Sequence, residues 1–145
     1  MSKQFIMIAE DDADDRYLME TALAETGFRQ NVTFVENGVE LLHHLESIDD
    51  FEGEGNFPKL ILLDLNMPKM DGREVLKKIK SHDIFRKIPV IVFSTTKNQL
   101  EVKRCYELGA NSYIVKPVSY DTLVETIRGL CTYWFSVATL IDNNC

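Results

Sequence analysis

The sequence predicts a doubly wound α/β domain, in which helices cover both faces of a parallel sheet. Short apolar runs alternate with amphipathic segments along the chain, giving five strand and helix units. The apolar runs are nearly continuous, which is typical of strands buried on both faces. Right-handed crossovers between such strands place helices on both sides of the sheet, and the expected fold class follows from that geometry.

The strands and helices can be assigned in order. Five apolar runs predict strands at 5–9 ("FIMIA"), 32–36 ("VTFVE"), 60–65 ("LILLDL"), 90–94 ("VIVFS") and 112–116 ("SYIVK"). Helical periodicity predicts helices at 14–26, 38–48, 71–82 and 97–108, with a last helix from about 119. Glycines and prolines fall at the ends of these elements, where they do least harm. The acidic, aperiodic stretch 47–59 predicts a long loop before the third strand.

Length, charge and hydropathy limit the classes of protein. A chain of 145 residues, 45% hydrophobic and 27% charged, is of the size of one domain with a single core. The net charge of −7 repels nucleic acid and anionic membranes, so we expect neither as a partner. No apolar run reaches the roughly 20 residues of a membrane span, and no signal-peptide pattern is present, so we expect a cytoplasmic protein.

Polar and charged residues follow four of the predicted strands. The first strand runs into Glu10-Asp11-Asp12, the third into Asp64, the fourth ends at Ser94, and the fifth ends at Lys116-Pro117. Ligands of doubly wound folds bind beyond the carboxyl ends of the strands, where these residues must meet. Clustered carboxylates must take up protons, pair with cations or bind a metal, and an all-oxygen set suits Mg²⁺ or Mn²⁺.

Some of these residues also have a purely structural interpretation. Asp11 or Asp12 can cap the first helix, and Asp71-Gly72 can be only a turn and a helix start. Two further residues, taken singly, can be solvated residues at the ends of strands: Ser94 and Lys116. The joint occurrence at four strand ends favours a functional site over these separate readings.

Four motifs, taken together, resemble those of a known family, the receiver domains of two-component response regulators. They are "AEDD" after the first strand, "DLNMPKMDG" after the third, Ser94-Thr95 after the fourth and "YIVKP" at the fifth, and the resemblance covers about residues 4 to 130. It implies a flavodoxin-like (βα)5 fold with strand order 2-1-3-4-5. The long loop 47–59 and the aromatic C-terminal segment are similar to those of single-domain receivers paired with bacterial phytochromes.

The resemblance also implies roles for the acidic residues. Asp64 matches the phosphoacceptor, and Glu10 and Asp11 match the acidic pair that holds Mg²⁺, or Mn²⁺, together with Asp64. Asn66 would offer its backbone carbonyl to the metal. Glu10 stands where the family more often has Asp, which lengthens the arm that reaches the metal.

The phosphate-binding and switch positions follow from the same resemblance. Ser94, with Thr95 beside it, stands where the family has Thr or Ser, and Lys116 matches the phosphate-pairing lysine. Lys116-Pro117 is a candidate for a cis peptide bond. Tyr113 matches the switch aromatic, although an ordinary aromatic of an edge strand has the same pattern.

We therefore expect a stand-alone receiver that takes a phosphoryl group from a sensor histidine kinase, which could be a phytochrome. It would be no enzyme beyond its own phosphorylation and autodephosphorylation. The alternative is a Mg²⁺-dependent phosphohydrolase or phosphotransferase of the haloacid dehalogenase type with Asp64 as nucleophile. Such enzymes have Asp two residues after the nucleophile, where this chain has Asn66. A flavodoxin-like FMN carrier would need a Ser/Thr/Gly-rich phosphate loop after the first strand, where this chain has acids.

We predict a single receiver domain, 1–145, in which residues 131–145 form an aromatic extension of the last helix. Trp134, Val137 and Ile141 recur at helical intervals and predict an apolar stripe. We expect this segment to form a homodimer, with packing against its own domain as the alternative. Four residues are the dimer candidates: Tyr133, Trp134, Phe135 and Val137.

Overall fold

A computed structural model describes residues 6–48 and 57–139 of the chain. Its sheet has five parallel strands: β1 (Ile6–Ala9), β2 (Val32–Val35), β3 (Leu60–Leu63), β4 (Val90–Ser94) and β5 (Ser112–Val115). The strand order is β2-β1-β3-β4-β5. Each predicted strand is present, so the predicted fold class and strand order are confirmed.

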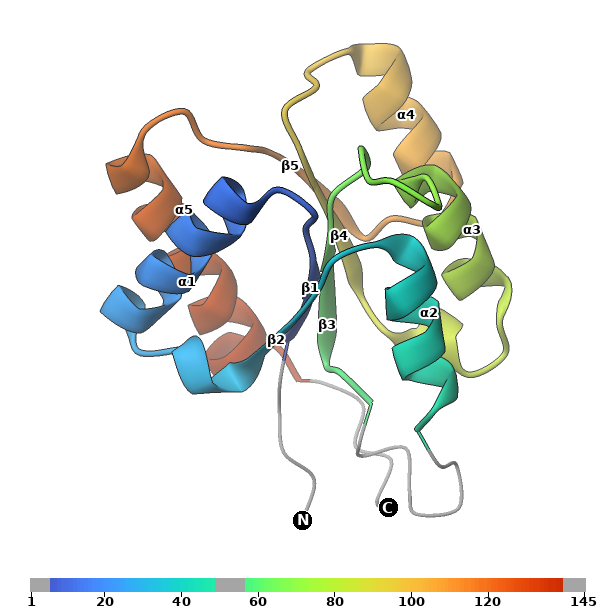
Figure 1. The fold of residues 1–145 in the computed structure, drawn as a ribbon, viewed down its shortest axis with the longest axis horizontal. Coiled ribbons are helices and arrows are strands. Elements are labelled where there is room, and N and C mark those ends of the chain that lie inside the picture. The colour runs from blue at the N-terminus through green and yellow to red at the C-terminus, as the bar shows by residue number, and fades with distance from the viewer. Residues whose placement is uncertain (1–5, 49–56, 140–145) are drawn as a thin grey trace.

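Helices cover both faces of this sheet (Figure 1). The α-helices are α1 (Ala13–Thr26), α2 (Gly38–Glu46), α3 (Gly72–Ser81), α4 (Gln99–Glu107) and α5 (Tyr120–Thr132). The described residues also form the 3₁₀ turns η1 (Arg29–Asn31) and η4 (Phe85–Lys87) and the π-helical turn η5 (Tyr133–Val137). In Figure 1, α1 and α5 lie on one side of the sheet, and α2, α3 and α4 lie on the other.

The predicted helix boundaries differ from the observed ones where a side chain caps the helix. Helix α4 starts at Gln99 rather than 97 because the Asn98 side chain accepts hydrogen bonds from the backbone N–H groups of Leu100 and Glu101. Helix α2 ends at Glu46 rather than 48. Most of the predicted loop 47–59 lies outside the described residues.

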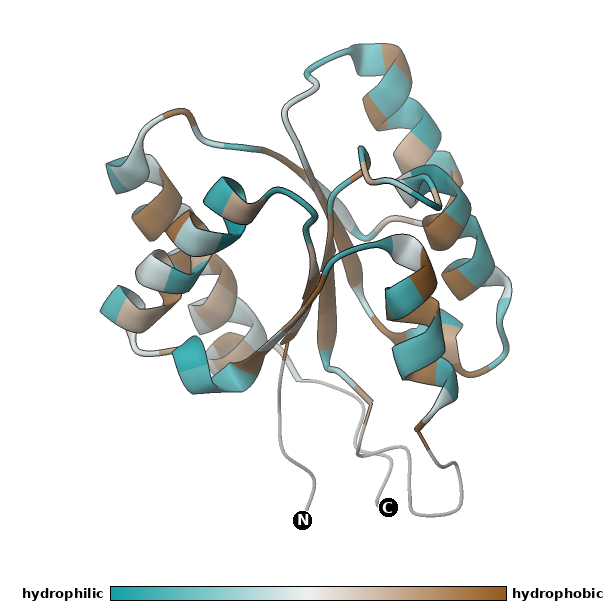
Figure 2. Cartoon of the chain, viewed as in Figure 1, coloured by the Kyte–Doolittle hydropathy of each residue, from teal (hydrophilic) through white to brown (hydrophobic). Residues whose placement is uncertain are grey.

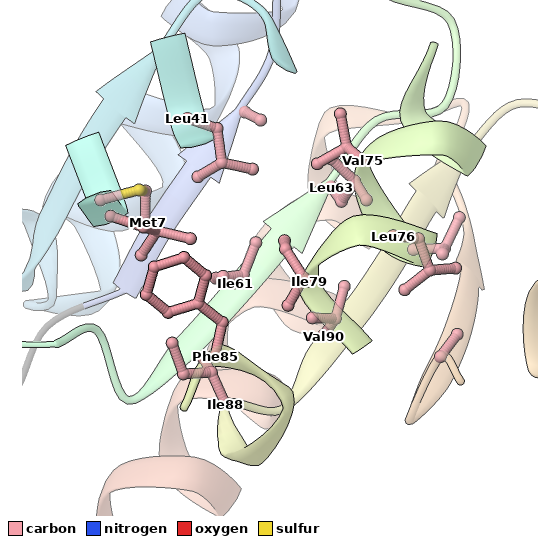
Figure 3. Close-up of a cluster of buried hydrophobic side chains, with 14 of the residues drawn as sticks. Met7, Leu41, Ile61, Leu63, Val75, Leu76, Ile79, Phe85, Ile88 and Val90 are labelled. Carbon is pink, nitrogen blue, oxygen red and sulfur yellow. The ribbon is translucent and has the colours of Figure 1, made fainter. Parts of the chain in front are cut away.

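Each face of the sheet has its own hydrophobic cluster. Alternate residues of a strand point to opposite faces, so Met7 belongs to the α2/α3 cluster, whereas Ile6 and Ile8 belong to the α1/α5 cluster. Figure 2 shows the strands as the hydrophobic centre of the molecule, with polar residues on the outward sides of the helices. Figure 3 shows part of the α2/α3 cluster, in which Ile61, Ile79 and Phe85 lie together.

The C-terminal turn η5 packs mainly on its own domain. Trp134 and Phe135 lie against the α1/α5 cluster, and the ring of Phe135 stacks on Phe28 with 5.9 Å between ring centroids. Tyr133 and Val137 are 50% and 66% exposed. The π-helical turn breaks the 3.6-residue periodicity, so the predicted stripe that joins Trp134 to Val137 is wrong. Residue 141, the third member of that stripe, lies outside the described residues.

The helices that the structure describes include none long and apolar enough to cross a membrane.

Candidate functional site

The carboxyl ends of the strands meet at one edge of the sheet, which lies at the top of Figure 1. The parallel hydrogen bonding continues past the ends of the strands. Asp64 N–H donates to the carbonyl of Ala9 at 3.1 Å, Glu10 N–H donates to the carbonyl of Val35 at 3.0 Å, and Lys116 N–H donates to the carbonyl of Ser94 at 2.8 Å. These bonds hold Glu10 next to Asp64, and they hold Lys116 next to Ser94, which ends the strand between β3 and β5.

Three carboxylates form a cluster at this edge. Oxygen atoms of Glu10, Asp11 and Asp64 all lie within 4.8 Å of one another. Glu10 and Asp64 are buried, at 1% and 6% exposure, and Asp11 is exposed. An all-oxygen set with one solvent-exposed member fits a hard divalent cation that keeps part of its water shell. The donor set therefore fits Mg²⁺ or Mn²⁺.

The ammonium group of Lys116 faces this cluster. Its Nζ atom lies 2.7 Å from Glu10 Oε1, 3.1 Å from Asp15 Oδ2 and 3.6 Å from Asp64 Oδ2. Burial by itself lowers the pKa of Lys116, but the hydrogen bond and charge of Glu10, with the charge of Asp64, raise this pKa above its ordinary value. Lys116 therefore stays protonated and partly neutralises the acidic edge.

Glu10 has an unusual protonation equilibrium. Burial raises the pKa of its carboxyl group from 4.5 to about 7; the hydrogen bond from Lys116 opposes this shift and the charge of Asp64 adds to it. In the metal-free protein, Glu10 is thus partly protonated at neutral pH. A cation that binds this cluster must displace that proton.

The aspartates beside the cluster have separate structural roles. Asp12 caps α1, because its Oδ1 atom accepts hydrogen bonds from the backbone N–H groups of Asp14 and Asp15. The capping alternative thus holds for Asp12 and not for Asp11, which remains available to a cation. Asp71 caps α3 by accepting from Arg73 N–H at 2.8 Å, so Asp71-Gly72 is indeed a helix start.

The loop after Asp64 is tightly packed against the site. Gly72 N–H donates to the carbonyl of Leu65 at 2.9 Å, and a Cβ atom at Gly72 would lie 2.6 Å from the carbonyl oxygen of Asp64. Only glycine fits there. Asn66 is exposed, and its backbone N–H lies 3.3 Å from Asp64 Oδ1, so it orients the Asp64 carboxylate. Lys69, at φ 69°, occupies the left-handed region, which a non-glycine residue rarely adopts.

The remaining predicted residues lie on the β4 and β5 side. Ser94 is fully buried, and its Oγ atom accepts a hydrogen bond from Thr96 N–H at 3.3 Å, whereas Thr95 is exposed. The half-buried Tyr113 donates its hydroxyl to the carbonyl of Thr96 at 2.8 Å. Tyr113 thus has its ring turned toward the start of the loop that leads to α4.

The predicted cis peptide bond between Lys116 and Pro117 is wrong for this structure, because no peptide bond between the described residues is cis. The trans form is the intrinsically favoured one, by about 0.5–1 kcal/mol for a bond that precedes proline. It is compatible with the contacts of Lys116 to Glu10 and Asp15.

Two features of this region were not predicted from the sequence. Asp15 pairs with Lys116 from the first turn of α1, and the signal that could have indicated it is the run of acids that continues from the first strand into this helix. Arg73 pairs with both Asp71 and Glu101 and so joins α3 to α4. Arg73 and Glu101 are 28 positions apart, and no local pattern connects them.

A flavodoxin-like domain whose carboxyl edge holds an acidic cluster and a facing lysine belongs to the class of receiver domains. The comparison with known families agrees: residues 6–128 match the model of the response regulator receiver domain. The chain belongs to this family. Receiver domains are signalling proteins of two-component systems, and they bind a divalent metal at their acidic pocket.

Similar proteins cover nearly the whole chain. The phosphorylated cyanobacterial phytochrome response regulator RcpA is 37% identical, with a TM-score of 0.85 over 97% of this chain and 100% of RcpA. Response regulator Rcp1 of Synechocystis is 33% identical over 93% of this chain and 91% of its own length. The Mn²⁺-bound structure of Rcp1 has a TM-score of 0.82, over 96% of this chain and 99% of that one. FilR2 of Methanothrix harundinacea, a probable methanogenesis regulatory protein, is 35% identical over 89% of this chain and 82% of its own length.

Proposed function

We propose that the protein accepts a phosphoryl group from a sensor histidine kinase onto Asp64 and then changes its partner-binding surface. One observation carries this proposal: the buried Asp64 carboxylate lies within 4.8 Å of the Glu10 and Asp11 oxygens and 3.6 Å from the Lys116 ammonium. A nucleophilic carboxylate between a metal-binding pair and a fixed cation is suited to phosphoryl transfer, because that reaction needs positioning and charge stabilisation.

Each residue of the site has a role in this reaction. An Asp64 oxygen attacks phosphorus, the bond from phosphorus to the histidine nitrogen of the kinase breaks, and the imidazole keeps the electron pair. Glu10, Asp11 and Asp64, with the backbone carbonyl of Asn66, would hold Mg²⁺, which offsets charge on the phosphoryl oxygens when it is bound. Lys116, whose Nζ atom lies 3.6 Å from Asp64 Oδ2, would pair with those oxygens.

The switch would involve the β4 and β5 side of the site. The buried hydroxyl of Ser94, with Thr95 next to it, ends β4, the strand beside β3, and new phosphoryl oxygens on Asp64 would attract it. Tyr113 is bonded to the Thr96 carbonyl, one residue beyond Thr95, so a shift of this loop would be transmitted to the aromatic ring. The loop leads into α4, whose surface would then change.

The enzyme alternative is less well supported. A phosphohydrolase of the haloacid dehalogenase type needs an acid two residues after its nucleophile, and Asn66 has no acidic group to donate or accept a proton. Here Asn66 contributes a backbone N–H to Asp64. We therefore propose that the protein carries out no turnover beyond its own phosphorylation and autodephosphorylation.

The partners and the cellular setting are also part of the proposal. The likeness to RcpA, a phytochrome response regulator, supports a phytochrome as the cognate kinase. The net charge of −7 supports neither nucleic acid nor an anionic membrane as a partner, and a cytoplasmic receiver is the proposed form.

A homodimer through the C-terminal segment is also proposed. Tyr133 and Val137 are exposed on η5 and would form the contact, whereas Trp134 and Phe135 would support it from behind. Sedimentation should show a dimer that the double substitution Tyr133→Ser and Val137→Ser weakens while the thermal unfolding curve is kept. A monomer at a concentration of about 100 µM, with and without phosphodonor, would exclude the dimer. A dimer that acts in signalling would have a dissociation constant below about 100 µM.

The proposed chemistry is tested with acetyl phosphate and Mg²⁺. Intact mass should show one added phosphoryl group that hydroxylamine removes, and Asp64→Asn should prevent it. Asp83→Asn changes an exposed aspartate after α3 in the same way and should leave the modification intact. Continuous hydrolysis of varied phosphate esters, without an acyl phosphate, would instead support the enzyme alternative.

A further inference from the structure

The first turn of α1 provides a carboxylate that contacts the phosphate-pairing lysine. Asp15 Oδ2 accepts a hydrogen bond from Lys116 Nζ at 3.1 Å. The Asp15 side chain is 42% exposed, whereas that of Lys116 is 12% exposed. The two residues also line one open cavity of about 200 Å³, together with Thr95 and Pro117. This carboxylate lies outside the three-carboxylate cluster that the site defines.

The lysine has more acceptors than it can satisfy after phosphorylation. Its ammonium group has three N–H donors. Glu10 and Asp15 accept two of the hydrogen bonds, at 2.7 and 3.1 Å, whereas Asp64 Oδ2 at 3.6 Å is beyond hydrogen-bonding distance. A phosphoryl group on Asp64 would add charge and three acceptor oxygens close to Lys116. The third N–H can reach only one of these oxygens, so the phosphoryl group competes with Glu10 and Asp15 for the ammonium group.

Asp15 is the partner that the lysine can release at least cost. Glu10 is 1% exposed, and its Oε2 atom also accepts a hydrogen bond from Asp12 N–H. If Lys116 left Glu10, water could not reach this buried carboxylate to replace the ammonium group. Asp15 is partly exposed on α1, so water can replace the ammonium group.

We propose that Asp15 is a positioning residue that holds Lys116 toward α1 and competes with the phosphoryl group for it. Asp15 thereby limits how tightly the phosphoryl group is held on Asp64. This inference rests on the proposed function, because it assigns a regulator to the same site. It also places the first turn of α1 among the parts that respond to phosphorylation, since Asp15 loses its partner when Lys116 moves.

The chain has a matched control for this role. Asp14 lies in the same turn of α1 and has the same charge, and its side chain is exposed and forms no ion pair with any described residue. Asp12, not Asp14 or Asp15, caps the helix. Asp14→Asn and Asp15→Asn therefore remove equal charge from the same helix end, and only Asp15→Asn frees Lys116.

The experiment measures binding of beryllium fluoride, an analogue of the phosphoryl group, in saturating Mg²⁺ by fluorine NMR. Asp15→Asn should bind it about fivefold more tightly than Asp14→Asn, which corresponds to a partly exposed ion pair of about 1 kcal/mol. In a Lys116→Ala background, Asp15→Asn and Asp14→Asn should bind it equally. A purely structural role of Asp15 would not depend on Lys116 in this way.

Three outcomes would overturn the inference. If Asp15→Asn and Asp14→Asn bind equally in the presence of Lys116, Asp15 does not restrain the lysine. If the fivefold difference persists without Lys116, Asp15 acts by direct repulsion of the anion. If the wild-type protein binds no beryllium fluoride and takes no phosphoryl group while remaining folded, the proposed function fails, and the inference fails with it.

Discussion

The two helical layers contact the residues at the carboxyl edge of the sheet in different ways. On the α2/α3 side, the backbone at Gly72 packs directly against the backbone of Asp64 and Leu65. On the α1/α5 side, the contact is a pair of charged side chains, Asp15 and Lys116, in an open cavity. Backbone packing leaves no freedom to adjust, whereas a partly hydrated ion pair can be exchanged for another at small cost.

This difference gives the two sides separate roles in the proposed phosphorylation. The α3 side keeps Asp64 in place, and the Arg73 contacts to Asp71 and Glu101 extend that fixed region to α4. The α1 side responds to a change of charge. Substitutions on the α3 side should therefore affect the stability of the domain, and those on the α1 side should affect the chemistry.

The largest effect is expected for Gly72→Ala. A methyl group there would overlap backbone atoms of Asp64 and Leu65 at 2.6 Å, and no flexible side chain can move to relieve the contact. We expect a loss of about 3 kcal/mol in the free energy of unfolding. Urea denaturation measures this loss.

Gly129→Ala is the matched control for this prediction. Gly129 lies on α5, and an added Cβ atom there meets nothing within 4 Å. The alanine should be neutral or add about 0.5–1 kcal/mol of stability, because glycine is the poorer helix former. If Gly72→Ala is tolerated as well as Gly129→Ala, the α3 side is not a rigid support for Asp64.

A smaller effect is expected for Phe135→Ala on the α1/α5 side. Phe135 stacks on Phe28 and lies against the α1/α5 cluster, but it is only partly buried. We expect a loss of about 2 kcal/mol in stability, with phosphoryl uptake unchanged. Thermal unfolding and intact mass with acetyl phosphate measure the two quantities.

Val137→Ala is the control, because Val137 is 66% exposed on the same turn and should change stability by less than about 0.5 kcal/mol. A change in phosphoryl uptake by Phe135→Ala at equal folded fraction would mean that this layer acts on the site through packing as well as charge. The distinction between a rigid α3 side and an α1 side that acts through charge would then be wrong.

The sequence allowed the fold and the centre of the site to be predicted, because both depend on local patterns. All five strands could be assigned from continuous apolar runs, and Glu10, Asp64 and Lys116 follow directly from the ends of three of them. The parallel arrangement then brings such residues together without further information.

The features that were missed depend on details that periodicity does not contain. Asp15 stands in a run of acids, "EDDADD", in which the cap, the metal-binding pair and the lysine partner have the same residue type. The predicted apolar stripe joined Trp134 to Val137 by the intervals of a regular α-helix, and η5 is π-helical. The packing of Trp134 and Phe135 against the α1/α5 cluster shows which side of this turn faces the domain.

A pH dependence of metal binding is expected at the point where the two sides meet. Burial raises the pKa of Glu10 from 4.5 to about 7 in the metal-free protein. The protonated carboxyl group therefore contributes stability below pH 4.5, and this contribution is lost as the pH rises through about 7. Since Mg²⁺ must displace this proton, its apparent affinity should fall by up to about tenfold per pH unit below pH 7, or 1.4 kcal/mol.

The increase in melting temperature caused by Mg²⁺ measures this dependence. It should be larger at pH 8 than at pH 6 in the wild type, and Glu10→Gln should remove most of the difference. An equal increase at both pH values in the wild type would mean that Glu10 is already ionised at pH 6.

The smallest effect is expected for Tyr113→Phe, which tests whether the β5 edge belongs to the rigid side. Burial raises the pKa of the Tyr113 phenol, so the hydroxyl stays protonated and donates to the Thr96 carbonyl at neutral pH. Its removal leaves a carbonyl that water can reach, so we expect a loss of only about 0.5–1 kcal/mol in stability. Phosphoryl uptake on Asp64 should be unchanged, because Tyr113 touches neither the acidic cluster nor Lys116 in the described contacts. Amide hydrogen exchange in α4 should nevertheless increase in the unphosphorylated protein, since the Thr96 loop that leads into this helix loses its tether. If exchange in α4 is the same in Tyr113→Phe and the wild type, the tyrosine does not hold this loop, and the rigid region ends at the pair of Arg73 and Glu101.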